Sequence, residues 1–334
     1  MTKLVIFFLI IIVFFSCSTR AALKRELALE YYNLGNYYYK NNNISEAVEF
    51  FNKAISFNPE LIKANYNLTL VLIIENRSDE ANEILIDLLI NDSENVSLLH
   101  LLGYSYYMQG DNEKALDIFN TILSVQQEDL NAVYNKGIVL WRMDLISEAT
   151  ECFNEILKFT ANTDIHGLYG DSLYALGDIM ISTEKWDDAV LYFNRFLEIK
   201  ILEEEPRISA IFFLIDAYEA LERFDMVLER YELLLELDNE NVEAWIGKAE
   251  VLLTKIEFPV KGLEALKTAI DLGFNDLSRL RVLLDDPELT EKEAVEDLLK
   301  EYDIFPPEAE VVEEELPADE EGAEHEEQNR ENND

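Results

Sequence analysis

The side chains able to do nucleophilic or metal chemistry are few in this sequence of 334 residues. There are two cysteines, Cys17 and Cys152, and three histidines, His100, His166 and His325. No two histidines have metal-ligand spacing, and no phosphate-binding glycine loop, nucleophile elbow or zinc-protease motif is present. Cys152 lies in an expected core segment, which favours a buried packing thiol over a nucleophile. The sequence therefore predicts a protein without catalytic activity, bound metal or cofactor.

Acidic side chains dominate the charge of the chain. Asp and Glu number 68 against 27 Lys and Arg, which gives a formal net charge of -41. Binding to nucleic-acid phosphates needs an excess of cations, so nucleic acid is excluded as a partner. Neighbouring carboxylates are so frequent at this density that they indicate solvated helix faces rather than acid–base catalysis. Hydrophobic residues still make up 49%, while Gly (11) and Pro (7) are scarce, which predicts a folded, helical protein.

The N-terminal segment has the pattern of an export signal. Twelve consecutive apolar residues, Leu4 to Phe15, precede Ser16 and Cys17. A helix of this length covers about 18 Å, well short of the roughly 30 Å hydrocarbon core of a bilayer. The run therefore suits the hydrophobic region of a signal peptide better than a spanning helix. An ordinary signal peptide cleaved elsewhere and an uncleaved anchor are the alternatives.

Cys17 directly after this run resembles the signal of a bacterial lipoprotein. In that family the cysteine becomes the lipidated first residue of the mature chain, with palmitate as one of its acyl groups. Ser16 fits the small residue expected before the cysteine, whereas Phe14 and Phe15 replace the usual leucine and small residue. The resemblance implies a signal peptide over residues 1–16 and a lipid-anchored, mostly periplasmic protein of the bacterial envelope, on either membrane.

Residues 17–27 form an expected juxtamembrane linker. This stretch carries Arg20, Lys24 and Arg25 against a single acid, Glu26. Cations next to a bilayer are attracted to anionic head groups, which supports attachment to a membrane.

A unit of 34 residues repeats along the body of the chain. Residues Gly35, Thr69, Gly103 and Gly137 are spaced at this period, alanine follows twelve positions later, and a large apolar residue comes four positions after that. The alanines are Ala47, Ala81, Ala115 and Ala149, and the large residues are Phe51, Leu85, Phe119 and Phe153. Small residues allow two helices to approach closely, and the large ones fill the space between successive pairs.

This period resembles the tetratricopeptide (TPR) repeat, a pair of antiparallel helices. The resemblance implies an all-α, right-handed solenoid of helical hairpins, with about seven repeats over residues 28–275. The fifth repeat keeps Gly177 and Phe193, and the seventh is centred on Trp245. In the sixth, Ile215 and Val227 replace small residues, which predicts looser or shifted packing. Residues 276–304 are expected to be helices that cap the last repeat.

The C-terminal segment, residues 305–334, is predicted to be a disordered acidic tail. Pro306 and Pro307 end the last helix, and residues 308–334 hold thirteen acids, one arginine and little to bury. Such a tail favours solubility, with a specific binding motif as the alternative.

In TPR proteins, repeat positions 2, 5, 9, 12 and 13 of the first helix line a concave groove. The candidate partner-binding residues at these positions are Tyr32, Asn36, Tyr39, Lys63, Tyr66, His100, Tyr104, Tyr107, Tyr134, Trp141, Arg142 and Tyr174. No Asp or Glu occupies them in the first four repeats, whereas repeats 5 and 6 bring in Asp171, Asp178, Asp216 and Glu219. The groove is thus expected to be aromatic and weakly basic at first and acidic further on. The alternative is that these positions pack between neighbouring helices.

Some TPR proteins hold a peptide's terminal carboxylate with a clamp of lysine and asparagine. Asn36 and Asn67 match the two asparagines of this clamp, but Tyr32, Ser97 and Leu101 stand where its cations would be. The sequence therefore does not predict carboxylate specificity.

The sequence predicts a membrane-anchored interaction scaffold or adaptor of the bacterial cell envelope. It would bind a peptide or helix of a partner protein in the groove, since tyrosine and tryptophan give large contact areas at low entropic cost. The alternative is a carrier of a small molecule or lipid, which would lie in an aromatic pocket of the same repeats.

Overall fold

The computed structural model of the chain describes residues 2–160, 166–199 and 203–304, with side chains from residue 20 onward except at positions 160 and 166. In these ranges every regular element is an α-helix, sixteen in all, and no strand is present. The all-α fold expected from the repeats is confirmed. Backbone contacts divide the chain into two compact units, Met1–Leu234 and Leu235–Asp334, and the expected solenoid range 28–275 extends over both.

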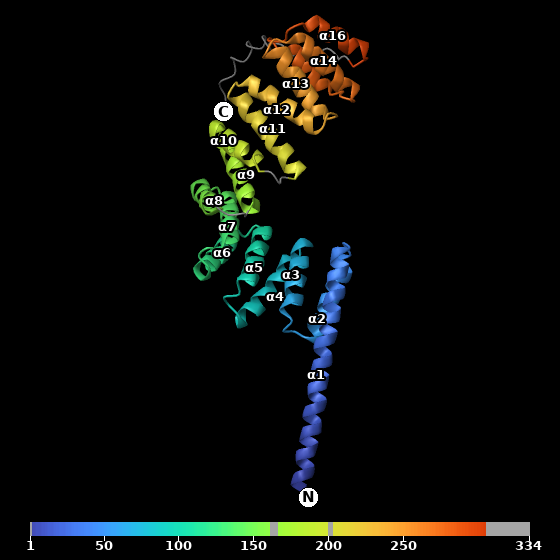
Figure 1. Cartoon of the computed structure of the whole chain (residues 1–334), viewed down its shortest axis with the longest axis vertical. Helices are drawn as coiled ribbons and strands as arrows, with labels where there is room; N and C mark the ends of the chain where they lie inside the picture. Colours follow the sequence, from blue (N-terminus) through green and yellow to red (C-terminus); the bar gives the residue numbers. More distant parts are fainter. Residues whose placement is uncertain (1, 161–165, 200–202, 305–334) are drawn as a thin grey trace, which may run out of the picture. The chain divides into compact units, whose positions relative to one another are not determined.

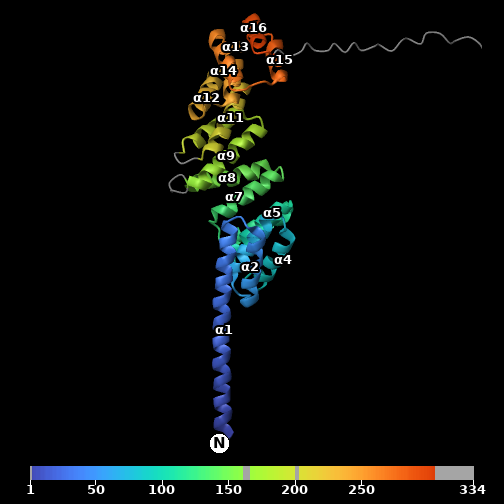
Figure 2. The same ribbon diagram turned by 90° about the vertical axis from the view of Figure 1, so that its right-hand side faces the viewer.

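The first unit consists of helix pairs that follow one another along the chain (Figures 1 and 2). We call the first helix of each pair the A helix and the second the B helix. The pairs are α1 (Thr2–Lys40) and α2 (Ile44–Phe57), α3 (Ile62–Ile74) and α4 (Ser78–Asn91), α5 (Val96–Gln109) and α6 (Asn112–Val125), α7 (Leu130–Arg142) and α8 (Ile146–Thr160), α9 (His166–Ser182) and α10 (Trp186–Leu197), and α11 (Glu204–Ala220) and α12 (Phe224–Leu237). Successive A helices also contact one another from α1 to α11, so they form one continuous layer.

Each A helix of this unit is followed by a residue in the left-handed conformation. These residues are Asn42, Asn76, Gly110, Asp144, Glu184 and Glu222, with φ between 56° and 80°. The next amide then donates to a carbonyl five residues earlier, as from Leu145 N to Leu140 O at 2.9 Å. This Schellman arrangement ends the helix and turns the chain. A non-glycine residue in this conformation costs about 1–2 kcal/mol, so the packing of the hairpin must hold Asp144, Glu184 and Glu222 there.

A glycine of the A helix packs directly against a phenylalanine of the B helix in four of these pairs. The partners are Gly35 with Phe51, Gly103 with Phe119, Gly137 with Phe153 and Gly177 with Phe193, and an added Cβ would lie 2.6 to 3.0 Å from the ring. In the second pair Thr69 takes the glycine position and the smaller Leu85 takes the ring position, both fully buried. The expected close approach of the two helices is confirmed.

The alanines of the repeat are also fully buried, and the predicted packing thiol is buried as well. Ala47, Ala81, Ala115 and Ala149 have no exposed surface. Cys152 is buried and free, and burial raises the pKa of its thiol, which disfavours the nucleophilic thiolate.

The sixth repeat is packed as tightly as the others despite its larger side chains. Ile215 is 2% exposed and Val227 is fully buried, and Tyr231 takes the place of the phenylalanine ring at 7% exposure. The looser packing expected here is therefore not found in the burial of these residues.

The second unit contains the seventh hairpin and its cap. The hairpin is formed by α13 (Val242–Thr254) and α14 (Pro259–Asp271), and the cap by α15 (Leu277–Asp285) and α16 (Lys292–Glu301). Leu280 and Val295 of the cap share a buried cluster with Leu266 of the hairpin. Arg279 donates to both carboxylate oxygens of Glu250 at 2.8 Å and to Glu243 at 2.6 Å. These contacts fasten α15 onto α13, so that the cap covers the last hairpin.

The N-terminal part of the chain is a single helix. Helix α1 runs from Thr2 to Lys40 without interruption and extends well past α2 (Figure 1), so the expected signal peptide and linker share one helix with the first repeat. In the described ranges, no helix has the length and apolar character needed to cross a bilayer. The Cys17 side chain and the acidic tail of residues 305–334 lie outside what the structure describes.

Replacing Gly103 with alanine is expected to destabilise the first unit, because the new Cβ would lie 2.8 Å from the Phe119 ring. Overpacking of this kind lowers the free energy of unfolding by about 1–3 kcal/mol, which urea unfolding followed by circular dichroism would measure. Gly167→Ala in α9 is the matched control, since no described atom outside its own stretch of helix lies within 4 Å of the added Cβ. Alanine should there leave stability equal or raise it by up to about 1 kcal/mol. Equal destabilisation of both variants would contradict the packing role of Gly103.

Candidate functional site

The twelve candidate partner-binding residues all lie on A helices, from α1 to α9. The structure brings five of them together around two adjoining cavities, and it places the others in contacts between neighbouring helices or on the surface. The five are Tyr104, Tyr107, Tyr134, Trp141 and Tyr174. We call the surface formed by these two cavities the A-helix groove.

The smaller cavity of the A-helix groove lies between α5 and α7. Its volume is about 240 Å³, and it is lined by Tyr104, Tyr107 and Tyr134 together with Phe119, Asn135, Ile138 and Val139. Tyr104 is 40% exposed, so its ring is available to a partner, whereas Tyr107 is half-buried.

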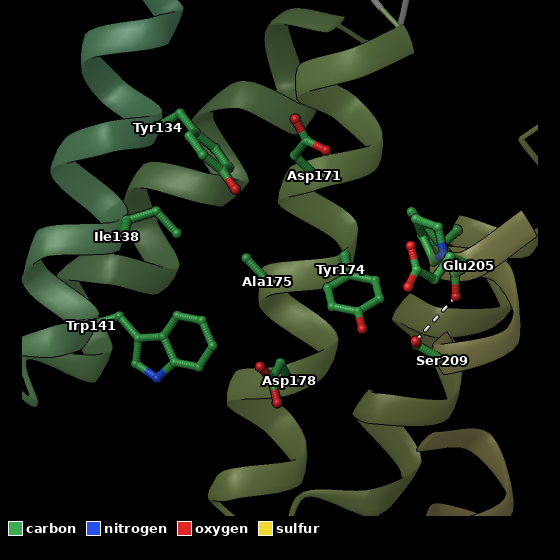
Figure 3. Close-up of a pocket in the computed structure, with 11 residues that line it drawn as sticks. Tyr134, Ile138, Trp141, Asp171, Tyr174, Ala175, Asp178, Glu205 and Ser209 are labelled. Atoms are coloured by element: carbon green, nitrogen blue, oxygen red, sulfur yellow. Dashed lines mark hydrogen bonds between the residues drawn. The ribbon is translucent and has the colours of Figure 1, made fainter. Parts of the chain in front are cut away.

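The larger cavity has a volume of about 490 Å³ and lies among α7, α9, α10 and α11. Tyr134 and Ile138 line both cavities, so the two are neighbours along the A helices. Figure 3 shows Asp171, Ala175 and Asp178 along α9, with Tyr134 and Trp141 of α7 on one side. On the other side, Tyr174 points toward Ser209 and Glu205 of α11 (Figure 3).

The rings of the larger cavity are held by the core beneath them. Tyr134 meets Phe153 edge-on with ring centroids 5.6 Å apart, and Tyr174 meets Phe193 at 5.7 Å and Phe196 at 5.3 Å. Because the phenylalanines are buried core residues, the two tyrosines have little freedom left to lose on binding. The aromatic walls are therefore pre-organised.

Burial controls the ionisation of the groups in the larger cavity. It raises the pKa of Tyr134 to about 12, with a smaller contribution from the charge of Asp171. The phenol therefore stays neutral and remains a hydrogen-bond donor at physiological pH. Burial likewise raises the pKa of the Asp171 and Asp178 carboxyls above their usual range. Within the part of the chain that the structure describes, neither carboxylate forms an ion pair.

The residues predicted at the N-terminal end of the groove mostly contact one another. Asn67 Nδ2 donates to Asn36 Oδ1 at 2.6 Å and lies 3.5 Å from the hydroxyl of Tyr32. Tyr32, Tyr39 and Tyr66 pack against the core cluster of the first three hairpins, and Lys63 is exposed. The two asparagines that resemble a carboxylate clamp thus bond to each other between α1 and α3. At this end of the groove, the predicted positions pack between neighbouring helices, which was the alternative interpretation.

Two further predicted residues, His100 and Arg142, also contact neighbouring helices. His100 Nε2 lies 3.0 Å from Asp129 Oδ2, while Asp129 Oδ1 accepts from Ala132 N at the start of α7. The Arg142 guanidinium lies 4.8 Å from the centre of the Tyr107 ring and donates to the Tyr107 carbonyl at 3.1 Å. Both side chains therefore fix α7 against α5, although part of each remains accessible.

Residues outside the predicted set complete the cavities. Phe119, expected as a core residue, lines the smaller cavity, and Phe196 lines the larger one together with Glu205 and Pro206 from the first turn of α11. Of the acids predicted at groove positions of repeats 5 and 6, Asp171 and Asp178 line the larger cavity, whereas Asp216 and Glu219 are not among its lining residues. In the described ranges, no group of three or more His, Cys, Asp or Glu side chains is placed to hold a metal ion.

Comparison with known protein families identifies the repeat. A tetratricopeptide repeat family matches residues 28–61. A second family with the same description matches residues 98–125. The first range contains the last part of α1 and all of α2, and the second contains most of α5 and all of α6.

Solved structures share the fold at low sequence identity. A tetratricopeptide repeat protein from Parabacteroides merdae is 16% identical and superposes with a TM-score of 0.51 over 83% of this chain and 99% of its own. PilW, described as a widely conserved type IV pilus biogenesis factor, is 15% identical with a TM-score of 0.51 over 65% of this chain and 92% of its own. At these identities the likeness concerns the fold alone.

A curated human protein is also similar over part of this chain. Protein O-mannosyl-transferase TMTC1 from Homo sapiens is 22% identical over 179 residues, which is 51% of this chain. This chain spans about a fifth of that relative's length, since the match covers 20% of it.

Replacing Asp178 with asparagine is expected to raise the melting temperature near neutral pH, because it removes a partly desolvated charge. Burial raises the folded-state pKa of Asp178 above its unfolded value. The wild type is therefore penalised at a pH above the folded pKa, and the penalty disappears as the pH falls below the unfolded pKa of about 3.9. Thermal unfolding of both proteins at pH of about 7 and about 3 measures the difference.

The matched control for this pH dependence is Asp117→Asn, which removes an exposed acid of α6 outside the cavity. It should change the melting temperature little at either pH. A lower melting temperature for Asp178→Asn at neutral pH would show that the Asp178 carboxylate stabilises the fold instead.

Proposed function

Because the chain is a tetratricopeptide-repeat protein, we propose that it is a non-enzymatic scaffold that binds an extended segment of a partner protein in its A-helix groove. The observation that carries this proposal is that two aromatic cavities adjoin along successive A helices and share Tyr134 and Ile138. A continuous track of this kind can contact several residues of one bound chain. The rings of Tyr104 and Trp141 would supply the large, low-entropy contact area that recognition surfaces use.

A carrier of a small molecule is the second candidate, and the larger cavity favours it. Its volume of about 490 Å³ lies in the range of roughly 300–1,000 Å³ that is usual for small-molecule sites. The carboxyls of Asp171 and Asp178 in the same wall count against a lipid or another apolar ligand, because burying unpaired carboxylates against an apolar surface is costly. The scaffold role therefore has the stronger support.

We further propose that the protein acts at the bacterial cell envelope, anchored by a lipid on Cys17. The support is the position of this cysteine at the end of the apolar run and the cations of residues 20–25. An anchored scaffold would hold a partner close to the bilayer. The fold shared with PilW, described as a pilus biogenesis factor, is consistent with a role in envelope assembly.

Replacing Tyr104 and Trp141 with alanine is expected to reduce recovery of the partner by about tenfold or more, because buried aromatic anchors carry most of the binding free energy. Crosslinking in intact cells, followed by quantification of the captured proteins, measures the loss. Tyr37→Ala is the matched control, since this tyrosine of α1 is 62% exposed and lines neither cavity. Unchanged recovery with folded Tyr104→Ala and Trp141→Ala proteins would place the binding surface elsewhere.

Replacing Cys17 with alanine is expected to abolish incorporation of radiolabelled fatty acid and to release the protein from the membrane fraction. The thiol of Cys17 would be the attachment point, so its removal leaves no acceptor. Cys152→Ser is the control, because this cysteine is buried in the repeat core and should leave labelling intact. Label that persists in Cys17→Ala would argue against the lipoprotein assignment.

A further inference from the structure

We propose that the larger cavity of the A-helix groove receives an arginine side chain of the bound partner segment. This inference rests on the proposed scaffold function, whose ligand class it specifies. The cavity combines flat aromatic walls with carboxylates, and a guanidinium group complements both, since it stacks on rings and bonds carboxylates in a planar fork.

Helix α9 presents the carboxylates in a regular arrangement. Asp171 and Asp178 are seven residues apart, so they lie on one face of the helix two turns from each other. Ala175 lies between them on this face, where its short side chain leaves space beside the rings of Tyr134 and Trp141 (Figure 3). An entering cation would therefore meet an acid at either end of an aromatic recess.

Among the residues that the structure describes, no cation forms an ion pair with the two aspartates of this recess. Arg142 of α7 lies over Tyr107, and Arg195 of α10 lies over Tyr169 and donates to its hydroxyl at 3.0 Å. In the described chain, neither cation pairs with Asp171 or Asp178. Desolvation raises the pKa of both carboxyls, and Asp178 is half-buried, so a cation that bound beside Asp178 would relieve an existing penalty.

The second unit contains an intramolecular example of the same chemistry. Glu243 and Glu250 of α13 are also seven residues apart on an A helix, and Arg279 bonds to both. The same guanidinium lies 6.0 Å from the centre of the Phe274 ring. Two acids at this spacing, with a ring nearby, thus hold one arginine in this chain. The larger cavity offers the same elements without an arginine.

The test is titration of the full-length protein with capped alanine peptides that carry one central arginine or its neutral isostere citrulline. The three tryptophans of the chain would be labelled as 5-fluorotryptophan, and the fluorine resonance of Trp141 would be identified from its loss in Trp141→Phe. We expect the arginine peptide to shift the Trp141 resonance while those of Trp186 and Trp245 stay unchanged. Replacing the arginine of the peptide with citrulline should weaken its affinity for the protein by about tenfold or more, because the charge-assisted hydrogen bonds are lost.

The double variant with Asp171→Asn and Asp178→Asn should lower the affinity for the arginine peptide to that of the citrulline peptide. Asp117→Asn is the matched control for the general attraction of a chain with net charge -41, and it should bind as the wild type does. Titrations at about 0.15 M salt limit that general attraction to about 8 Å. Because the arginine–citrulline comparison uses the wild type, the test does not depend on the folding of a variant.

Equal affinities for the arginine and citrulline peptides would overturn the proposal. Tighter binding of tetramethylammonium than of the arginine peptide would also overturn it, because the cavity would then be a site for a small cation. If partner capture depends on Tyr104 and Trp141 but arginine has no advantage over citrulline, the cation site alone falls and the scaffold function stands. If the arginine preference holds but partner capture does not depend on Tyr104 and Trp141, the crosslinking experiment contradicts the proposed scaffold function.

Discussion

The close approach of each A helix to its B helix is the constraint on which the rest of the first unit depends. A glycine on one helix and a ring on the other set this distance in four hairpins, as in Gly103 with Phe119. Hairpins of the same internal geometry leave the same face of each A helix uncovered, and contact between successive A helices brings these faces together. Side chains at the same repeat position therefore lie in a row along successive A helices. Tyr134 and Tyr174 occupy the same position of successive repeats, and both line the larger cavity.

Much of the fold was predictable because it depends on packing at a fixed period. Glycine, alanine and phenylalanine at their repeat positions are sufficient to predict the hairpins, and the structure buries them as expected. The turns were less visible, since Asp144, Glu184 and Glu222 adopt a left-handed conformation that is usually marked by glycine. Packing of the hairpin overrides the local preference there. The signal available in the sequence was that these residues recur at the same place after each A helix.

The candidate site was predictable in part, for a related reason. Repeat position indicates which side of a helix a residue occupies, but it does not indicate whether that side is covered by the next helix. Asn36 and Asn67 therefore bond to each other although both occupy positions typical of a groove or clamp. Conversely, Glu205 enters the larger cavity from the first turn of α11, outside the repeat positions from which the groove was predicted. Such residues depend on how neighbouring hairpins rotate against each other.

The larger cavity is a place where fold stability and binding have opposite requirements. Asp178 is half-buried beside aromatic rings, so its ionised carboxylate costs stability unless a cation approaches it, and the more exposed Asp171 lies in the same cavity wall. A fully solvated acid carries no such cost, so solubility alone gives no reason to place Asp178 against aromatic rings. In the second unit, Arg279 shows that the chain can provide its own arginine to two acids of one A helix where the pairing serves structure. The absence of such an arginine from the described surroundings of Asp171 and Asp178 fits a site whose positive charge comes from a partner.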